Sequence, residues 1–201
     1  SFGAEVVMTS DQWSNGTERV AEAHQKLGGG YDIVVNLQGD APLTPPWFVE
    51  DLISGLRDAP NAGVATPVLR CDGAALNGFL SDRRAGRVGG TTAVFAADRT
   101  ALYFSKEVIP FTSRRYGDLE DTPVFHHVGV YAYRPDALAE YHDWPVGPLE
   151  RLEGLEQLRF MENGRPVLCV EVEARGRQFR ELNNPEDVPK LEAMMTEMGL
   201  E

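Results

Sequence analysis

A carboxylate beside a glycine follows an apolar segment near the start of the chain. The segment Tyr31–Gln38 is rich in β-branched residues and predicts a buried strand, and Gly39 and Asp40 come directly after it. Glycine lets a ligand approach the backbone closely, and a carboxylate oxygen is a ligand that Mg²⁺ prefers. The pattern therefore indicates a ligand site in which Asp40 holds Mg²⁺. An ordinary strand-ending turn explains the same residues, because Gly-Asp pairs are common in turns.

A second polar group opens a predicted helix. Ser14-Asn15-Gly16-Thr17-Glu18-Arg19 leads into a helical pattern over Thr17–Leu27. Backbone N–H groups at a helix N-terminus attract anions or a carbonyl oxygen of a base. Arg19 is unfavourable for the helix dipole in the first turn, which favours a ligand contact or a pair with a carboxylate. Thr17 as an N-cap explains the same segment without a ligand.

Histidines and acidic residues also occur in the second half of the chain. His126 and His127 are adjacent on a predicted strand and face opposite sides, so they cannot chelate one metal together. Glu156 lies three residues from both Glu153 and Arg159 on a predicted helix, which is typical of a solvated charged face.

The elements that must position these residues alternate between strand and helix patterns. Strands are predicted at Ala4–Met8, Tyr31–Gln38, Val64–Leu69, Thr92–Ala96, Ala101–Ser105, His127–Arg134 and Val167–Val172. Helices are predicted at Thr17–Leu27, Trp47–Leu56, Pro135–Tyr141, Pro148–Met161 and Pro185–Met195, and a surface loop at Asp72–Gly90. This alternation predicts an α/β fold with a mostly parallel sheet and helices on both faces. Ligands of such sheets bind beyond the carboxyl ends of the strands, where Asp40 lies.

Composition limits the class of protein. The 201 residues are 42% apolar, which predicts one α/β domain over residues 1–201. The net charge of −12 argues against general nucleic-acid binding, and no apolar run reaches the length of a membrane span. Cys71 and Cys169 are far apart in apolar contexts, which predicts reduced thiols in a cytoplasmic protein. The chain starts abruptly on a strand pattern, so we expect a further segment before Ser1 and no signal peptide.

Six stretches together resemble the 3-deoxy-manno-octulosonate (KDO) cytidylyltransferase family. They read NGTERVAEA, VVNLQGDAPL, ALYFSKEVIPF, HHVGVYAYR, GPLERLEGLEQLRF and NNPEDV, in family order and spacing over essentially the whole chain. Each stretch alone is weak, whereas the ordered set is specific. The resemblance implies a three-layer αβα fold of the nucleotide-diphospho-sugar transferase type. It also implies a preceding segment with a glycine-rich, basic loop that holds a triphosphate.

The resemblance implies a reaction and its partners. CTP and KDO would give CMP-KDO and pyrophosphate for lipopolysaccharide or capsule synthesis, with Mg²⁺ as cofactor and no nucleic acid or membrane as partner. A homodimer would form through residues 122–161, where Leu149, Leu152 and Phe160 could pack across a two-fold axis. The alternative is that these three side chains only cover the sheet of their own chain.

The family motifs also imply roles for individual residues. Nucleotide binding falls to Asn15, Gly16, Thr17, Arg19 and Gln38, sugar binding to His127, Tyr131, Glu156 and Gln157, metal binding to Asp40 and Asn183, and catalysis to Asp40 and Lys106. Four positions depart from the family pattern. Asn183 replaces an aspartate, Lys106 an arginine, Thr92 a lysine and Asn15 a serine. A different sugar, such as 8-amino-KDO or sialic acid, or a catalytically weakened relative therefore remain as alternatives. Because His127 and Tyr131 are four residues apart on one predicted strand, we expect both to face one cleft.

Overall fold

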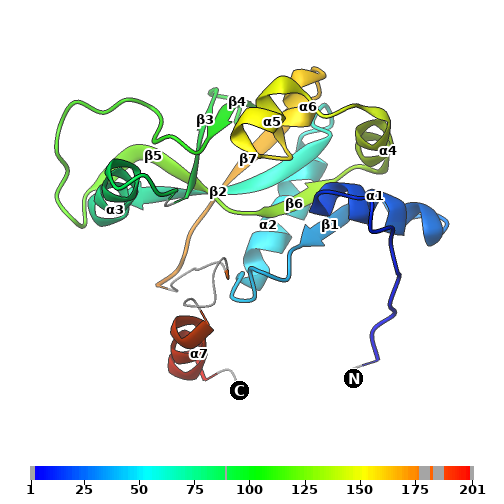
Figure 1. The fold of residues 1–201 in the computed structure, drawn as a ribbon, viewed down its shortest axis with the longest axis horizontal. Coiled ribbons are helices and arrows are strands. Elements are labelled where there is room, and N and C mark those ends of the chain that lie inside the picture. The colour runs from blue at the N-terminus through cyan, green and yellow to red at the C-terminus, as the bar shows by residue number, and fades with distance from the viewer. Residues whose placement is uncertain (1–2, 89, 177–181, 183–187, 200–201) are drawn as a thin grey trace.

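A twisted central sheet carries the fold in the computed structural model, which describes residues 3–88, 90–176, 182 and 188–199 (Figure 1). The strands of this part of the chain are β1 (Val34–Leu37), β2 (Val64–Asp72), β3 (Thr91–Phe95), β4 (Ala101–Ser105), β5 (Asp121–His127), β6 (Val130–Tyr133) and β7 (Val167–Val172). Its helices are α1 (Gly16–Lys26), α2 (Pro46–Asp58), α3 (Gly73–Arg84), α4 (Pro135–Asp143), α5 (Pro148–Glu153), α6 (Leu158–Glu162) and α7 (Val188–Glu197).

The sheet is antiparallel except at one pair of the described strands. The strand order is β1-β6-β2-β5-β3-β4, and β7 pairs in parallel with β2, where Val64 lies beside Val167. The prediction of a mostly parallel sheet is therefore wrong. A parallel pair needs a long crossover, usually through a helix. Residues 96–100 between β3 and β4, and 128–129 between β5 and β6, are too short for one.

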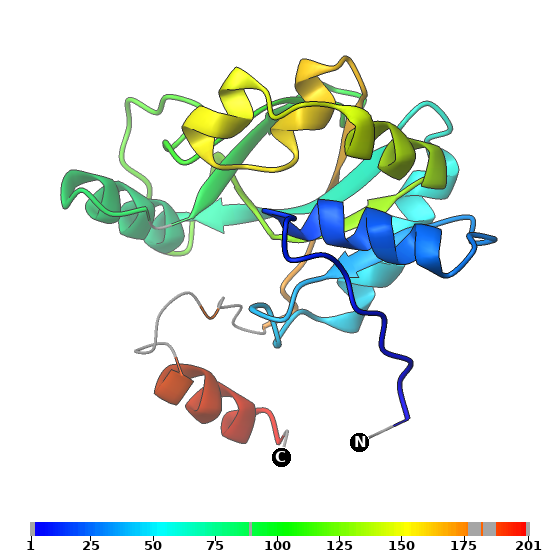
Figure 2. The ribbon, with the colours of Figure 1, turned by 45° about the vertical axis from the view of Figure 1, so that its right-hand side comes forward.

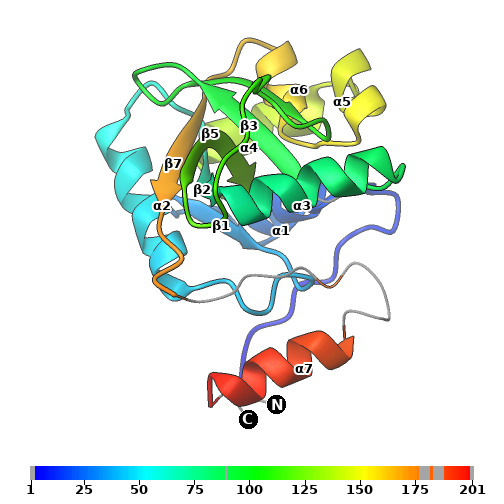
Figure 3. The same cartoon turned by 90° about the vertical axis from the view of Figure 1, so that its left-hand side faces the viewer.

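Helices pack on both faces of the sheet, as the alternating patterns predict. Val64 and Tyr133 belong to a core with α1, α4 and α6, whereas Ala65 and Ala132 pack against α2. Neighbouring residues of a strand point to opposite faces, which divides these pairs between the two cores. Figure 2 shows α4, α5 and α6 above the sheet and α2 below it. The C-terminal helix α7 lies apart from these layers in each ribbon view (Figure 3).

Two segments differ from the predicted elements in the first half of the chain. Asp72–Gly90 is not a loop, because α3 occupies most of it. Asp72 caps this helix, and its apolar Leu76, Phe79 and Leu80 follow helical spacing. Ala4–Met8 forms no strand, because no described segment pairs with it.

The predicted helix Pro148–Met161 is wrong as a single element. Gly154 adopts a left-handed conformation with φ of 63° and ends α5, and α6 starts at Leu158. Leu152 is 83% exposed, whereas Phe160 is fully buried in its own chain's core. Phe160 therefore cannot serve in the predicted dimer contact.

The predicted strand His127–Arg134 is wrong as one element as well. His127 ends β5, and β6 starts at Val130, whose amide donates to the Val128 carbonyl at 2.7 Å in the bend between them. The sequence did not predict β5 itself. The last predicted helix corresponds to α7, and residues 185–187 lie outside the described part. None of the described helices has the length and apolarity that crossing a bilayer requires.

Candidate active site

An open pocket of about 510 Å³ lies where the end of β1 meets the start of α1. Its walls include four of the residues predicted to bind nucleotide and the predicted metal ligand, namely Asn15, Gly16, Arg19, Gln38 and Asp40. A side chain on Gly16 would begin only 2.9 Å from Asn36 Nδ2 and 3.1 Å from Gln38 Nε2. The close approach of α1 to β1 therefore favours glycine at this position, because any side chain would displace these two amides.

Asn15 builds the pocket through both ends of its amide. Its Oδ1 accepts the Glu18 amide at 2.9 Å and caps α1, and its Nδ2 donates to the Tyr141 hydroxyl at 3.0 Å. The interpretation of Thr17 as the N-cap is wrong, because Asn15 holds that position. The Thr17 amide and hydroxyl are left for other partners.

Arg19 lines the outer part of the pocket. Its guanidinium donates to the Ser10 carbonyl at 3.1 Å and to the Trp13 carbonyl at 3.0 Å. The side chain thus braces the segment before α1, and its contact with a ligand stays a prediction.

Asp40 stands exposed in the turn after β1. The Ala41 amide donates to the Gln38 carbonyl at 3.1 Å and closes this turn, and the Leu182 amide donates to the Asp40 carbonyl at 2.7 Å. Within the described ranges no side chain engages the Asp40 carboxylate, and no group of three or more metal-binding side chains occurs. One free carboxylate fits Mg²⁺, which proteins often hold through one or two carboxylates and substrate phosphates. Asn183, the other predicted ligand, lies outside the described residues.

Glu156 connects the pocket with the residues predicted to bind sugar. Its Oε2 accepts the Thr17 amide and its Oε1 accepts Gln38 Nε2, both at 2.8 Å. The Thr17 hydroxyl also lies 2.7 Å from the hydroxyl of the buried Tyr133. Burial raises the pKa of Glu156 above its ordinary value, and the Thr17 and Gln38 hydrogen bonds offset this only in part.

His127, Tyr131 and Gln157 form a buried polar group on the same side of the sheet. The Tyr131 hydroxyl donates to Gln157 Oε1 at 3.1 Å, and the His127 and Tyr131 ring centres are 5.6 Å apart. His127 and Tyr131 lie on β5 and β6 rather than on one strand, and the bend between the strands still brings them together. His127 Nε2 lies 2.9 Å from Thr66 Oγ1. Burial lowers the pKa of His127 to about 3, so its ring is neutral at pH 7.

Lys106 does not lie on the pocket wall. Its backbone amide donates to Glu153 Oε2 at 2.9 Å, and its Nζ is 3.0 Å from where a side chain on Gly154 would begin. Thr92 anchors the adjoining loop, because its hydroxyl donates to the Glu107 carbonyl at 2.7 Å. The structure therefore places Lys106 by the turn between α5 and α6, away from Asp40.

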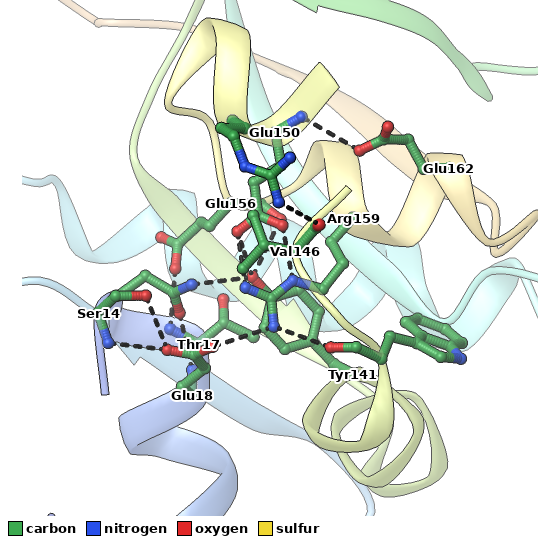
Figure 4. A network of polar contacts seen from close by, with 12 residues as sticks. Ser14, Thr17, Glu18, Tyr141, Val146, Glu150, Glu156, Arg159 and Glu162 are labelled. Carbon is green, nitrogen blue, oxygen red and sulfur yellow. Dashed lines mark hydrogen bonds and ion pairs between the residues drawn. The ribbon is translucent and has the colours of Figure 1, made fainter. Parts of the chain in front are cut away.

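A buried cluster of charged residues supports both sides of the site. Arg159 is 2% exposed and pairs with Glu18 of α1 and Glu150 of α5 (Figure 4). The predicted solvated face is therefore wrong at Arg159, and its partner Glu150 is buried as well. The sequence signal that could have identified Arg159 is that both of its neighbours, Leu158 and Phe160, are apolar, and the structure buries both.

Several known proteins are similar to this chain in sequence. A family model described as cytidylyltransferase matches residues 1–172. The chain is 41% identical to a 3-deoxy-manno-octulosonate cytidylyltransferase of Maricaulis maris, over 98% of this chain and 75% of that protein. It is 39% identical to an 8-amino-3,8-dideoxy-manno-octulosonate cytidylyltransferase of Shewanella pealeana, with the same coverage.

A solved structure is similar as well. The structure of CMP:2-keto-3-deoxy-manno-octonic acid synthetase complexed with CTP superposes with a TM-score of 0.79 at 32% identity. The match covers 98% of this chain and 74% of that chain.

Proposed function

The chain belongs to the cytidylyltransferase family, and from that premise we propose that it transfers CMP from CTP to KDO. The anomeric hydroxyl of KDO would attack the α-phosphorus of CTP, and pyrophosphate would leave. Such a reaction needs positioning and charge stabilisation more than a protein nucleophile. The names of the similar proteins and the CTP in the similar solved structure support this assignment.

One observation carries the proposal in this chain. The hydrogen bond from Gln38 Nε2 to Glu156 Oε1 joins the pocket of β1 and α1 to the predicted sugar side. Gln38 thereby lies between the two places where the substrates would bind. Two substrates held on either side of one amide are placed for direct transfer, which lowers the entropic part of the barrier.

Each side offers groups suited to its substrate. On the nucleotide side, the pocket wall carries the N-terminal end of α1 at Gly16 and the side-chain amides of Asn36 and Gln38, which can hydrogen-bond a nucleotide. On the other side, Glu156 can accept a sugar hydroxyl proton in a hydrogen bond. His127 is neutral and so adds a hydrogen-bonding group there without adding charge.

We propose Mg²⁺ as the cofactor, with Asp40 as its protein ligand. Bound there, Mg²⁺ would neutralise charge that develops on the phosphate oxygens during transfer. The free and exposed Asp40 carboxylate supports this role. Asn183 comes next in the sequence after Leu182, whose backbone amide donates to the Asp40 carbonyl. We propose the side-chain amide oxygen of Asn183 as a weaker second ligand.

The sugar 8-amino-KDO is a second candidate substrate. The 39% identity to a cytidylyltransferase named for that sugar favours it as the second candidate. Lys106 stands where the family resemblance implies an arginine. An arginine binds a carboxylate with two parallel hydrogen bonds, whereas a lysine ammonium acts as a point charge. A panel of both sugars and sialic acid, each with CTP, separates these candidates.

Pyrophosphate release from CTP and Mg²⁺ with each sugar tests the function. We expect release with KDO or 8-amino-KDO, and its absence with both would refute the proposal. Asp40→Asn should lower turnover at least about a hundredfold, because it removes the charge that holds the cation. Asp32→Asn is the matched control, since Asp32 is exposed at the opposite end of the same segment. Equal turnover of Asp40→Asn and Asp32→Asn would show that Asp40 takes no part in the reaction.

We also propose a homodimer through residues 122–161 and a cytoplasmic location. Leu149 and Leu152 support the first, because both are exposed and lie three residues apart on α5, and neighbouring exposed apolar side chains can mark an interface. The two buried, unpaired thiols of Cys71 and Cys169 support the second.

A further inference from the structure

Arg159 occupies the centre of the polar network in Figure 4. Its guanidinium binds Glu150 with two hydrogen bonds of 2.6 and 2.7 Å, and its Nη1 donates to Glu18 Oε1 at 3.0 Å. The guanidinium carbon lies 4.1 Å from the centre of the Tyr141 ring. Because the side chain is 2% exposed, these charge-assisted bonds hold one geometry with little competition from water.

Glu18 carries the connection from Arg159 to the nucleotide side. Its Oε2 accepts the Ser14 amide at 2.8 Å and the Ser14 hydroxyl at 3.1 Å. The carboxylate that Arg159 holds therefore also closes the turn before α1. Burial opposes ionisation of Glu18, but the Ser14 and Arg159 donors outweigh it and keep its pKa below the ordinary value.

Tyr141 carries a second connection, toward the sugar side. Its hydroxyl accepts from Asn15 Nδ2 at 3.0 Å and can donate to the Glu156 carbonyl at 3.2 Å or to Glu150 at 3.4 Å. The ring of Tyr141 rests on Arg159, and its hydroxyl joins the cap of α1 to the turn that presents Glu156. Both connections thus converge on one guanidinium.

We propose that Arg159 is a positioning residue that couples the two substrate sites. It holds the turn of residues 14–17 and the turn of residues 154–157 at one spacing, and it does so without contact to either ligand. This inference rests on the proposed transfer reaction. Buried ion pairs often contribute little net stability, so a role in stability alone does not account for the cluster.

Arg159→Lys tests the coupling, with Arg134→Lys as the matched control. A lysine has three N–H donors on one nitrogen and lacks the planar fork, so it cannot reproduce the two bonds to Glu150 together with the bond to Glu18. Arg134 is also partly buried, but its guanidinium donates to the carbonyls of Leu56 and Ala62, outside the site. Calorimetric titration with CTP and Mg²⁺, without sugar, should show about tenfold weaker binding for Arg159→Lys and no change for Arg134→Lys. In the complete reaction, kcat should fall for Arg159→Lys alone.

Two further measurements separate coupling from general loss of structure. Hydrogen exchange in Arg159→Lys should accelerate over residues 14–18 and 154–158 together, without any ligand present. Glu18→Gln cuts only the nucleotide-side connection, so it should weaken CTP binding and leave the KM of the sugar unchanged. The double variant should bind CTP no more weakly than Arg159→Lys, because both changes act through one contact.

The outcomes distinguish this inference from the proposed function. If Arg159→Lys and Arg134→Lys lower the unfolding temperature alike and leave CTP affinity and kcat/KM unchanged, Arg159 is only structural and the inference is overturned. If the wild-type protein binds CTP but transfers CMP to no sugar, the proposed function is refuted. The CTP affinities and hydrogen exchange of the variants still decide whether Arg159 couples the two sites. Wild-type protein that does not bind CTP would overturn both.

Discussion

Replacing Gly16 by alanine would disturb the contact between α1 and β1. The new methyl group would lie 2.9 Å from Asn36 Nδ2 and 3.1 Å from Gln38 Nε2, whereas ordinary contact begins near 3.4 Å. The two amides must therefore retreat by about 0.5 and 0.3 Å. Gln38 cannot retreat freely, because its Nε2 is bound to Glu156 at 2.8 Å.

The expected cost follows from packing and from this hydrogen bond. Overpacking by one methyl group costs about 1–3 kcal/mol, while alanine gains up to about 1 kcal/mol over glycine within a helix. Weakening the bond to the buried Glu156 adds to the loss. We expect Gly16→Ala to lower the free energy of unfolding by about 1–2 kcal/mol. It should also weaken CTP binding, because the displaced amides lie on the pocket wall.

Urea unfolding and calorimetric titration with CTP measure both effects. Gly78→Ala is the matched control, because Gly78 lies in α3 and a methyl group there meets nothing within 4 Å. That variant should gain about 0.5–1 kcal/mol and bind CTP normally. If Gly16→Ala were as stable as Gly78→Ala and bound CTP with wild-type affinity, the close approach of α1 to β1 would contribute neither to stability nor to CTP binding.

Three further predictions concern charge, thiols and association. Burial raises the pKa of Glu156, so its proton stabilises the fold below about pH 4.5 and this contribution is lost as pH rises through the raised pKa. The free energy of unfolding of Glu156→Gln should therefore exceed that of wild type near pH 7 but not near pH 4, and the variant should lose transfer activity. A difference in unfolding free energy that does not change with pH would contradict this. Burial raises the pKa of Cys71 and Cys169 to about 12, so iodoacetamide at pH 8 should label both thiols only in denaturant, as read by mass spectrometry. Leu152 is 83% exposed, and Leu152→Asp should weaken self-association about tenfold in sedimentation equilibrium at unchanged thermal stability; a wild type that stays monomeric would refute the dimer.

The sequence was sufficient where the signal is local. The polar segment before α1, the glycine and carboxylate after β1, and the apolar periodicity of α1, α2 and α4 all depend on residues close together in the chain. The ordered motifs also predicted the family, which the comparisons confirm. Asn15, Gly16, Arg19, Gln38 and Asp40 belong to two such local segments, and the structure brings the segments together at one pocket.

Tertiary structure alone decided which strands pair and which charges are buried. Strand direction depends on hairpins such as β3–β4, and a pattern of apolar residues does not specify the partner of a strand. The bond from Gln38 to Glu156 spans 118 positions and that from Arg159 to Glu18 spans 141. A charge on a helix surface and a charge in a core have the same local spacing, and only packing against distant segments removes water from one of them.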